Sequence, residues 1–345
     1  MISITSKQKR WLLFLQIIIS VAALLYVIYK IVIFEHWNAF FSWINEHFLL
    51  FKWLIVIQLA LSFLNISLET LKWRLLTSLL ERLTFFETMR QVLYGILIGT
   101  ITPAKLGEPF GKAMFLKKGN RSQGIILSFT GSIFQNIIIM IFGIKAFFVL
   151  QNYFFRFGGL FHELQEKMLL YVLLPITILI SLFFVTYKFF LSKKKKLILN
   201  RMGLFLGIIK KIDRIKLAKL LLFTLLRYIT FSFQLWIILK IFNIFDSSLQ
   251  FWLIPLYYLI VTFLPTMMLA DLGVRGSAAL LVFGMASQNS AAILCAIFII
   301  WFFNVALPAI SNLFLKLESP TKSHFDLPQR SQSAKLDWQV FEDTH

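Results

Sequence analysis

Apolar stretches long enough to cross a lipid bilayer are the feature that most restricts the fold of this chain. Residues 11–34 form the first such stretch, and further ones cover about 48–68 and 124–150. About 20 apolar residues in an α-helix are enough to cross the hydrocarbon core. Because 59% of the 345 residues are hydrophobic and only 15% are charged, the interior of a soluble protein could not enclose them. The sequence therefore predicts an all-α, polytopic integral membrane protein.

Six full membrane crossings are expected in total. The second half of the chain adds three comparable stretches, at about 169–190, 217–243 and 288–315. We expect residues 11–315 to form one transmembrane domain. Residues 1–10 are then a cytoplasmic N-terminal tail, and residues 316–345, which are rich in Ser and Gln and contain Pro, are expected to be a disordered cytoplasmic tail.

Two further apolar stretches, at 91–116 and 251–284, are interrupted in the middle. The residues expected to form the turns are Pro103, Gly107, Pro265 and Gly273. The half-length helices on either side are too short to cross the membrane, and irregular backbone at membrane depth needs protein or water around it. We therefore expect two re-entrant helical hairpins. The alternative is that Pro and Gly merely kink two ordinary spans.

The order of these segments predicts an inverted repeat. The halves, about 11–150 and 169–315, each contain two spans, an interrupted stretch and a third span. Three crossings per half place the second half upside down relative to the first, so the first hairpin enters from the cytoplasm and the second from outside. Inverted repeats with paired broken helices are typical of transporters, and the breaks indicate the substrate site.

Basic residues gather on one side of this topology. The chain has 35 Lys and Arg against 16 Asp and Glu, a net charge of +19. Twenty-five of the Lys and Arg lie in the tails and in residues 69–90, 117–121 and 188–219, against six on the other side. Cytoplasmic loops carry such an excess, so we expect a multi-pass protein of the cell inner membrane with both termini cytoplasmic. The basic loops would contact anionic lipid headgroups, and no soluble basic module for nucleic-acid binding is visible.

Charged residues within the predicted membrane segments are the candidate substrate-binding residues, since charge in the bilayer is costly and usually functional. They are Lys105, Glu108, Lys112, Arg227, Asp271 and Arg275. Glu108 with Lys112, and Asp271 with Arg275, have the i,i+4 spacing of ion pairs on one helix face. Two readings stay open: these charges contact a substrate phosphate, or they only neutralise each other within the membrane.

Other polar residues are expected to have structural roles. Gln135 and Asn136 lie in the middle of the third span, where hydrogen bonds between helices are expected. The end of the second span is followed by Glu69, Lys72, Trp73 and Arg74. We expect these four to form an anchoring belt at the cytoplasmic interface, followed by an amphipathic surface helix at 75–90.

Motifs of catalysis and metal binding are missing from the sequence. It contains no nucleophile elbow, no Walker loop and no zinc-protease motif. The five His have no ligand spacing, and there is a single Cys. We therefore expect no enzyme activity, no metal and no cofactor.

The first interruption, residues 102–113, resembles a segment of a known family. This family is the transmembrane, flippase-like region of lysylphosphatidylglycerol synthetases, which has a Pro-x-x-x-Gly-Glu-x-x-Arg-Ala type of pattern. Its interface motif, Lys or Arg followed by Trp-Arg, is matched by residues 72–74, and its Gly-Leu-Gly-Val-Arg-Glu segment by residues 271–276. The resemblance covers about residues 10–315 and implies lipid handling. Because a soluble synthetase domain is missing, it implies a stand-alone form and argues against lysyl transfer.

The sequence departs from the family pattern at positions that bear on the site. Lys112 stands where Arg is usual, which keeps the charge but loses the bidentate fork. Asp271 stands where the family often has Gly, and Gly276 where it often has Glu. Gln135 and Asn136 take the place of an acidic and basic pair. Substrate choice or ion coupling can therefore differ from the family pattern.

Together these observations predict a lipid or lipid-linked-sugar transporter. Its partner would be a membrane phospholipid or a polyprenyl-phosphate-linked sugar, bound by its phosphate between the two hairpins. One alternative is a membrane-embedded transferase that uses a lipid-linked donor. Another is a non-transporting partner of an envelope-synthesis complex.

Overall fold

The computed structural model is helical throughout the part of the chain that it describes, which comprises residues 32, 37–102, 105–156, 207, 213–264 and 270–314. Within this part, four helices are long and apolar enough to cross a membrane. They are α3 (Phe48–Thr77), α6 (Arg121–Arg156), α8 (Arg214–Ile241) and a continuous C-terminal helix made of α11 (Ser290–Trp301), the π-helical turn η4 (Phe302–Ala306) and α12 (Leu307–Phe314). The chain is a multi-pass membrane protein.

These four helices confirm the spans expected at 48–68, 124–150, 217–243 and 288–315. The spans expected at 11–34 and 169–190 lie outside the described residues, as do the tails at 1–10 and 316–345. A short helix, α2 (Trp37–Glu46), precedes α3.

The segment after α3 differs from the expected surface helix at 75–90. Helix α3 continues to Thr77, and the next helix, α4 (Phe85–Ile101), begins after a short connection. The start of α4 is set by a capping box, in which the Glu87 side chain accepts from the backbone N–H of Thr84 and the Thr84 hydroxyl accepts from that of Glu87. The expected surface helix was therefore wrong.

The first interruption is present as expected. Helix α4 ends at Ile101 and α5 (Gly107–Ala113) begins at Gly107. The Thr102 hydroxyl joins them, because it donates to the carbonyl of Ile98 at 2.9 Å and accepts from the Gly107 N–H at 2.8 Å. The other expected turn residue, Pro103, lies outside the described residues.

The second interruption separates α9 (Leu253–Phe263) from α10 (Ala270–Phe283). The short 3₁₀ turn η3 (Ser248–Trp252) precedes α9. Pro265 lies outside the described residues, and Gly273, which we expected in the turn, lies within the first turn of α10. The i,i+4 ion pair between Asp271 and Arg275 spans Gly273 and supports helix at this position.

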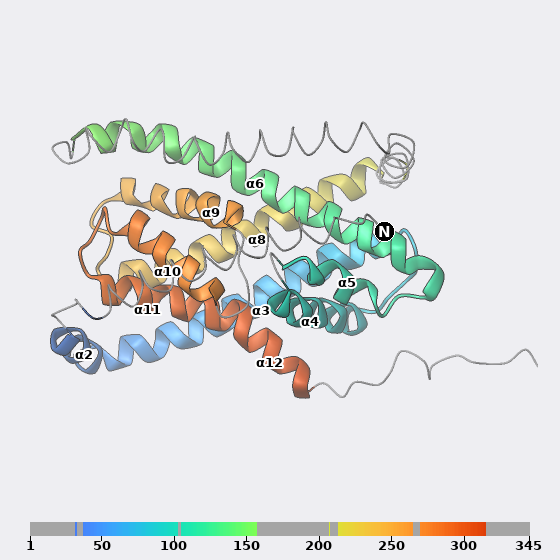
Figure 1. Ribbon diagram of the computed structural model, residues 1–345, viewed down its shortest axis with the longest axis horizontal. Helices are drawn as coiled ribbons and strands as arrows, with labels where there is room; N and C mark the ends of the chain where they lie inside the picture. Colours follow the sequence, from blue (N-terminus) through green and yellow to red (C-terminus); the bar gives the residue numbers. More distant parts are fainter. Residues whose placement is uncertain are drawn as a thin grey trace, which may run out of the picture.

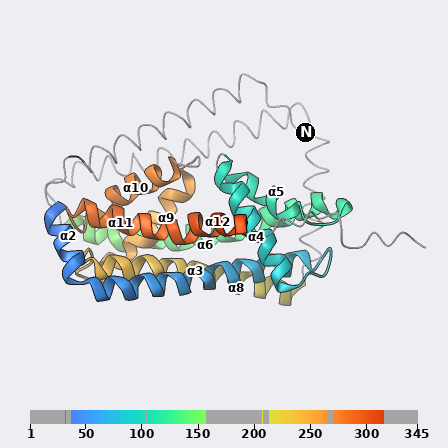
Figure 2. The same ribbon diagram turned by 90° about the horizontal axis from the view of Figure 1, so that it is seen from below.

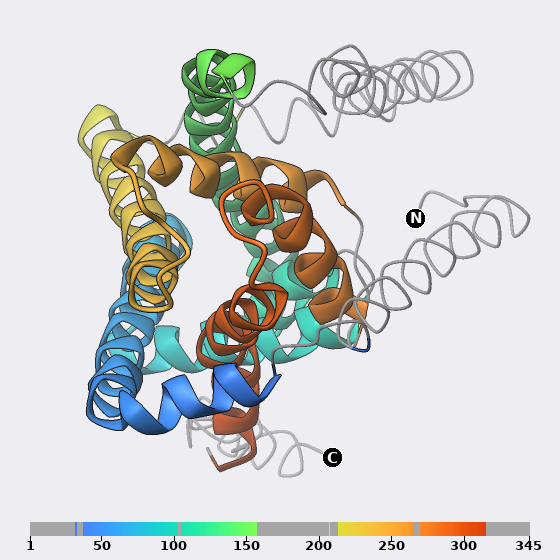
Figure 3. The same cartoon turned by 90° about the vertical axis from the view of Figure 1, so that its left-hand side faces the viewer.

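The two interrupted pairs lie toward opposite ends of the bundle. Helices α3, α6 and α8 run along its long axis, α4 and α5 lie toward one end, and α9 and α10 toward the other (Figures 1 and 2). The C-terminal ends of α4 and α9 and the N-terminal ends of α5 and α10, which border the interruptions, lie toward the middle of the bundle (Figure 2). Seen along the long axis, α3 and α8 form one side and α10 lies on the opposite side, and α9 crosses from α8 to α10 (Figure 3).

Apolar packing holds these helices in place and leaves their outer faces apolar as well. The larger buried cluster joins α6, α8, α9, α10 and α11 around residues such as Leu235, Tyr257 and Phe283. A smaller one surrounds Trp73 and Val92 beside α4 and α5. Large apolar side chains also remain exposed along the outside of the long helices. This distribution suits a protein whose surroundings are lipid tails rather than water.

Candidate functional site

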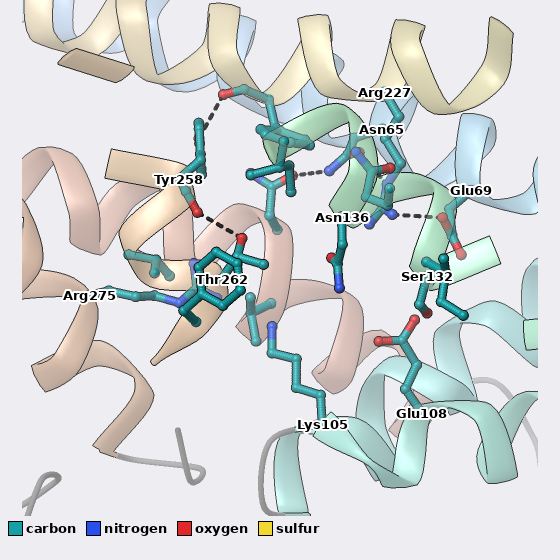
Figure 4. A pocket seen from close by; sticks show the side chains of 18 of the residues that line it. Asn65, Glu69, Lys105, Glu108, Ser132, Asn136, Arg227, Tyr258, Thr262 and Arg275 are labelled. Carbon is teal, nitrogen blue, oxygen red and sulfur yellow. Dashed lines mark hydrogen bonds and ion pairs between the residues drawn. The ribbon is translucent and has the colours of Figure 1, made fainter. Parts of the chain in front are cut away.

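A cavity of about 590 Å³ lies inside the bundle, between the two interrupted helix pairs. Its wall is formed by α3, the connection between α4 and α5, and helices α5, α6, α8, α9, α10, α11 and η4 (Figure 4). The charged side chains that line it are Glu69, Lys72, Lys105, Glu108, Arg227 and Arg275. Polar neutral side chains come from Asn65, Ser132, Gln135, Asn136, Thr262 and Asn304. The cavity is therefore a charged and polar chamber within apolar membrane helices.

The carboxylate of Glu69 is the centre of an ion-pair cluster. Its Oε2 lies 2.6 Å from Nζ of Lys72 and 2.7 Å from Nη1 of Arg227, and its Oε1 lies 2.6 Å from Nζ of Lys112. We call Glu69, Lys72, Lys112 and Arg227 the Glu69 cluster. Because its basic members come from α3, α5 and α8, one carboxylate connects three helices.

The structure corrects the expected anchoring belt. Glu69 is 4% exposed, and Lys72 and Trp73 are buried too. The indole Nε1 of Trp73 donates to Oε1 of Gln91 at 2.7 Å, and only Arg74 is exposed, where its Nε donates to the Leu83 carbonyl. The belt was wrong because α4 packs against α3 here, while Lys112 of α5 and Arg227 of α8 reach Glu69.

Glu108 and Lys112 form the expected i,i+4 ion pair on α5, at 2.7 Å between Oε1 and Nζ. Lys112 therefore bridges two acids, Glu108 on its own helix and Glu69 on α3. The Glu108 side chain is less buried than that of Glu69 and lines the cavity, where it points toward Ser132 (Figure 4). Lys112 does not line the cavity and lies behind Glu108.

Asp271 and Arg275 on α10 also form their expected i,i+4 ion pair, at 2.9 Å between Oδ2 and Nε. Arg275 lines the cavity, whereas the buried Asp271 supports it from behind. The two interrupted pairs thus present charges to the same chamber, α5 through Glu108 and α10 through Arg275.

Lys105 lies in the break between α4 and α5, and its side chain extends into the cavity (Figure 4). In the described part of the chain its Nζ has no ion-pair or hydrogen-bond partner. Its backbone has a φ of 55°, in the left-handed region that residues other than Gly rarely adopt. This strained position carries an amine that is available to a ligand.

The structure thus brings Lys105, Glu108, Arg227 and Arg275 together around one cavity, with Lys112 and Asp271 as their ion-pair partners. Sequence reasoning missed Glu69 and Lys72 as members of the site. A signal was present, because Asn65, Glu69 and Lys72 recur at helical spacing on one face of α3.

A chain of side-chain amides continues from Arg227. Its Nε donates to Oδ1 of Asn65 at 3.0 Å, and Nδ2 of Asn65 donates to Oδ1 of Asn304 at 2.6 Å. Nδ2 of Asn304 in turn donates to Oε1 of Gln234 at 3.1 Å. Asn304 belongs to the π-helical turn η4, and π-helical turns frequently mark functional sites. The amides connect α3, α8 and the C-terminal helix along the cavity wall.

Gln135 and Asn136 do not form the expected hydrogen bonds between helices. Gln135 is 8% exposed, and neither atom of its side-chain amide has a partner among the described residues. Asn136 is exposed, and both residues line the cavity. Within the part of the chain that the structure describes, this face of α6 borders the cavity, so the two amides lack the expected bonds to another helix. As for metals, no group of three or more His, Cys, Asp and Glu side chains lies together within the described ranges.

The sequence of this chain matches a known protein family. Residues 13–311 match the family model of the lysylphosphatidylglycerol synthase TM region. The chain belongs to this family. Neither the curated proteins nor the solved structures that were compared with it contain a match. The matched region includes all the cavity-lining residues, so the cavity is a feature of the lysylphosphatidylglycerol synthase TM region of this chain.

Proposed function

We propose that this protein transports a lipid across the membrane and binds the phosphate of its headgroup in the central cavity. One observation carries the proposal: among the residues that the structure describes, four basic side chains and two acidic ones line a chamber within apolar membrane helices. Charge in such a place is costly, and the surplus of base suits an anionic headgroup. The proposed partner is a phospholipid or a polyprenyl-phosphate-linked sugar.

The basic residues that line the cavity differ in whether an acidic side chain already pairs with them. The Glu69 carboxylate already engages Lys72 and Arg227, and Asp271 engages Arg275 through Nε. Lys105 has no such partner among the described residues, so it is the first candidate for the phosphate. The guanidinium of Arg275, which reaches the cavity from α10 on the same side as Lys105 (Figure 4), supplies further donors.

The proposed architecture has six spans and two re-entrant hairpins, α4–α5 and α9–α10, related as an inverted repeat. It is supported by the opposite placement of the two pairs, whose helix ends at the interruptions lie toward the middle of the bundle (Figure 2). In transporters with paired broken helices the substrate site lies near the midplane. A cavity between the breaks fits that arrangement.

The proposed orientation has both termini on the cytoplasmic side of a bacterial inner membrane. Helices α6 and α8 begin at the same end of the bundle (Figure 1), and exposed bases such as Lys117, Lys118 and Arg214 lie beside these two starts. Basic residues at one end are expected on the cytoplasmic side. The family match supports lipid handling, and we propose transport rather than enzyme activity.

Reconstitution tests the proposal directly. The purified protein is placed in liposomes with fluorescent phospholipids or labelled polyprenyl phosphates, and movement between leaflets is followed by a quencher that cannot cross the membrane. We expect faster movement of at least one phosphate-bearing lipid than in protein-free liposomes. Lipids that move at the protein-free rate in every case would overturn the proposal.

A further inference from the structure

The wall that α6 contributes to the cavity carries polar side chains on one face, Ser132, Gln135 and Asn136. Both amide atoms of Gln135 lack a hydrogen-bond partner among the described residues, although the side chain is more than nine-tenths buried. Buried polar groups are nearly always hydrogen-bonded, so each exception needs an explanation. For a buried amide that borders a cavity, a ligand that completes its hydrogen bonds is such an explanation.

The acids of the site are already engaged. Glu69 binds three bases, Glu108 pairs with Lys112, and Asp271 pairs with Arg275. Within the described ranges, the cavity lining and its ion-pair partners comprise five bases and three acids, so positive charge is in excess. The bases are Lys72, Lys105, Lys112, Arg227 and Arg275. An ammonium group on a ligand would add to this excess, and none of the three acids is without an ion-pair partner to receive it.

The hydrogen-bonding capacity of the Gln135 amide further restricts which chemical class of headgroup fits. A Gln side chain offers two donors and an acceptor. A hydroxyl group both donates and accepts, so neighbouring hydroxyls satisfy both amide atoms. An ammonium group only donates and a phosphate only accepts, so either would leave one atom of Gln135 unpaired. The position of Asn136, which points into the cavity toward Lys105 (Figure 4), adds a second amide beside the proposed phosphate.

We propose that the transported lipid carries a neutral, hydroxyl-rich headgroup, such as glycerol or a sugar, beside its phosphate, and that Gln135 is the residue that selects it. The inference rests on the proposed transport function. The phosphate binds beside Lys105, and the hydroxyl-rich headgroup binds the α6 wall at Gln135 and Asn136. Lipids with an ammonium headgroup are disfavoured.

Three phospholipids that share one labelled acyl chain test the selection: phosphatidylglycerol, phosphatidylethanolamine and phosphatidic acid. Labelled polyprenyl phosphate with and without a hexose forms a second set. In liposomes with the wild-type protein, we expect the hydroxyl-bearing member of at least one set to move fastest. Phosphatidylethanolamine should move about tenfold more slowly than phosphatidylglycerol, because its binding forfeits a hydrogen bond to the amide.

Two variants assign the selection to Gln135. Gln135→Leu should slow the hydroxyl-bearing lipid about tenfold and leave the matching bare phosphate within about twofold of wild type, because only the headgroup contact is lost. Gln135→Glu should shift preference toward phosphatidylethanolamine, since a new carboxylate can receive the ammonium group. Ser128→Ala is the matched control, because Ser128 is also buried and unpartnered on α6 within the described residues but does not line the cavity.

The possible results separate the two proposals. If the wild-type protein moves several lipids with no preference among headgroups, or Gln135→Leu slows all of them equally while remaining monodisperse, the selection fails and transport stands. If the wild-type protein moves none of the five lipids, the transport function fails and the selection with it. If Gln135→Leu does not fold, Gln135→Glu is the deciding variant. A shift toward phosphatidylethanolamine supports headgroup selection by Gln135, and an unchanged preference overturns it.

Discussion

The guanidinium of Arg227 on α8 lies 2.7 Å from the carboxylate of Glu69 on α3, measured from Nη1 to Oε2. This ion pair connects the two halves of the chain beside the cavity. The same carboxylate also binds Lys72 and, from α5, Lys112. Glu69 therefore connects α5, and with it the break that carries Lys105, to the long helices α3 and α8.

Glu69→Gln should be strongly destabilising, because it leaves the buried Lys72 and Lys112 and the partly buried Arg227 without their shared carboxylate. Breaking a buried ion pair by removing one partner costs about 3–5 kcal/mol. Thermal unfolding of the detergent-solubilised protein measures the effect. Glu46→Gln is the matched control, since Glu46 is exposed on α2, and it should leave the melting temperature unchanged. Equal melting temperatures for both variants would contradict the central role of Glu69.

The double variant Glu69→Gln with Arg227→Gln should cost less than the sum of the two single changes, because each single change leaves the other residue unpaired. Residues in direct contact typically show a coupling of about 0.5–3 kcal/mol. A double-mutant cycle on the free energy of unfolding measures it. Strict additivity would mean that the 2.7 Å contact contributes nothing.

Gly111→Ala should separate α4 from α5. A Cβ on Gly111 would lie 2.9 Å from the Cα of Gly95 and 3.1 Å from the carbonyl oxygen of Tyr94, both of which are backbone atoms. Forcing such an overlap costs about 1–3 kcal/mol. Gly119→Ala is the control, since a Cβ there meets nothing within 4 Å. Thermal unfolding should separate the two variants, and similar stability would argue against close packing of α4 on α5.

Arg275→Ala should slow the transport of phosphate-bearing lipids, by about tenfold if one charge-assisted hydrogen bond is lost. Arg275→Lys should restore only part of the rate, because Lys keeps the charge without the planar fork. Arg214→Ala is the control, since Arg214 is exposed at the start of α8. Leaflet-exchange rates in liposomes measure all three, and full activity of Arg275→Ala would remove Arg275 from the site.

Cysteine labelling in intact cells tests the proposed orientation. In a Cys295→Ser background, cysteines at Asn45 and Ser247, both exposed at the end of the bundle opposite the starts of α6 and α8, should react with an impermeant thiol reagent added outside. A cysteine at Lys118, which precedes α6, should react only after the cells are opened. The reverse pattern would invert the topology.

Local properties of the sequence were enough to predict the membrane helices that the structure describes. Hydropathy depends only on neighbouring residues, and it located α3, α6, α8 and the C-terminal helix. The presence of the two breaks was predicted from Pro and Gly, which act on the backbone where they stand, although Gly273 lies within α10 and not in the turn. The pairs Glu108–Lys112 and Asp271–Arg275 were predictable because helix geometry alone places residues four apart on one face.

Contacts between distant segments were decided only by the tertiary structure. Charges at the end of a span look like an interface, so Glu69 was assigned to an anchoring belt, whereas α5 and α8 bring Lys112 and Arg227 onto it. Gln135 was expected to bond another helix, whereas the cavity leaves its amide without a partner in the described part of the chain. The sequence by itself determined the four described spans and the presence of the two interruptions, because those depend on local backbone and hydropathy. The partners of each buried polar group depend on how the helices pack, and no local pattern contains that information.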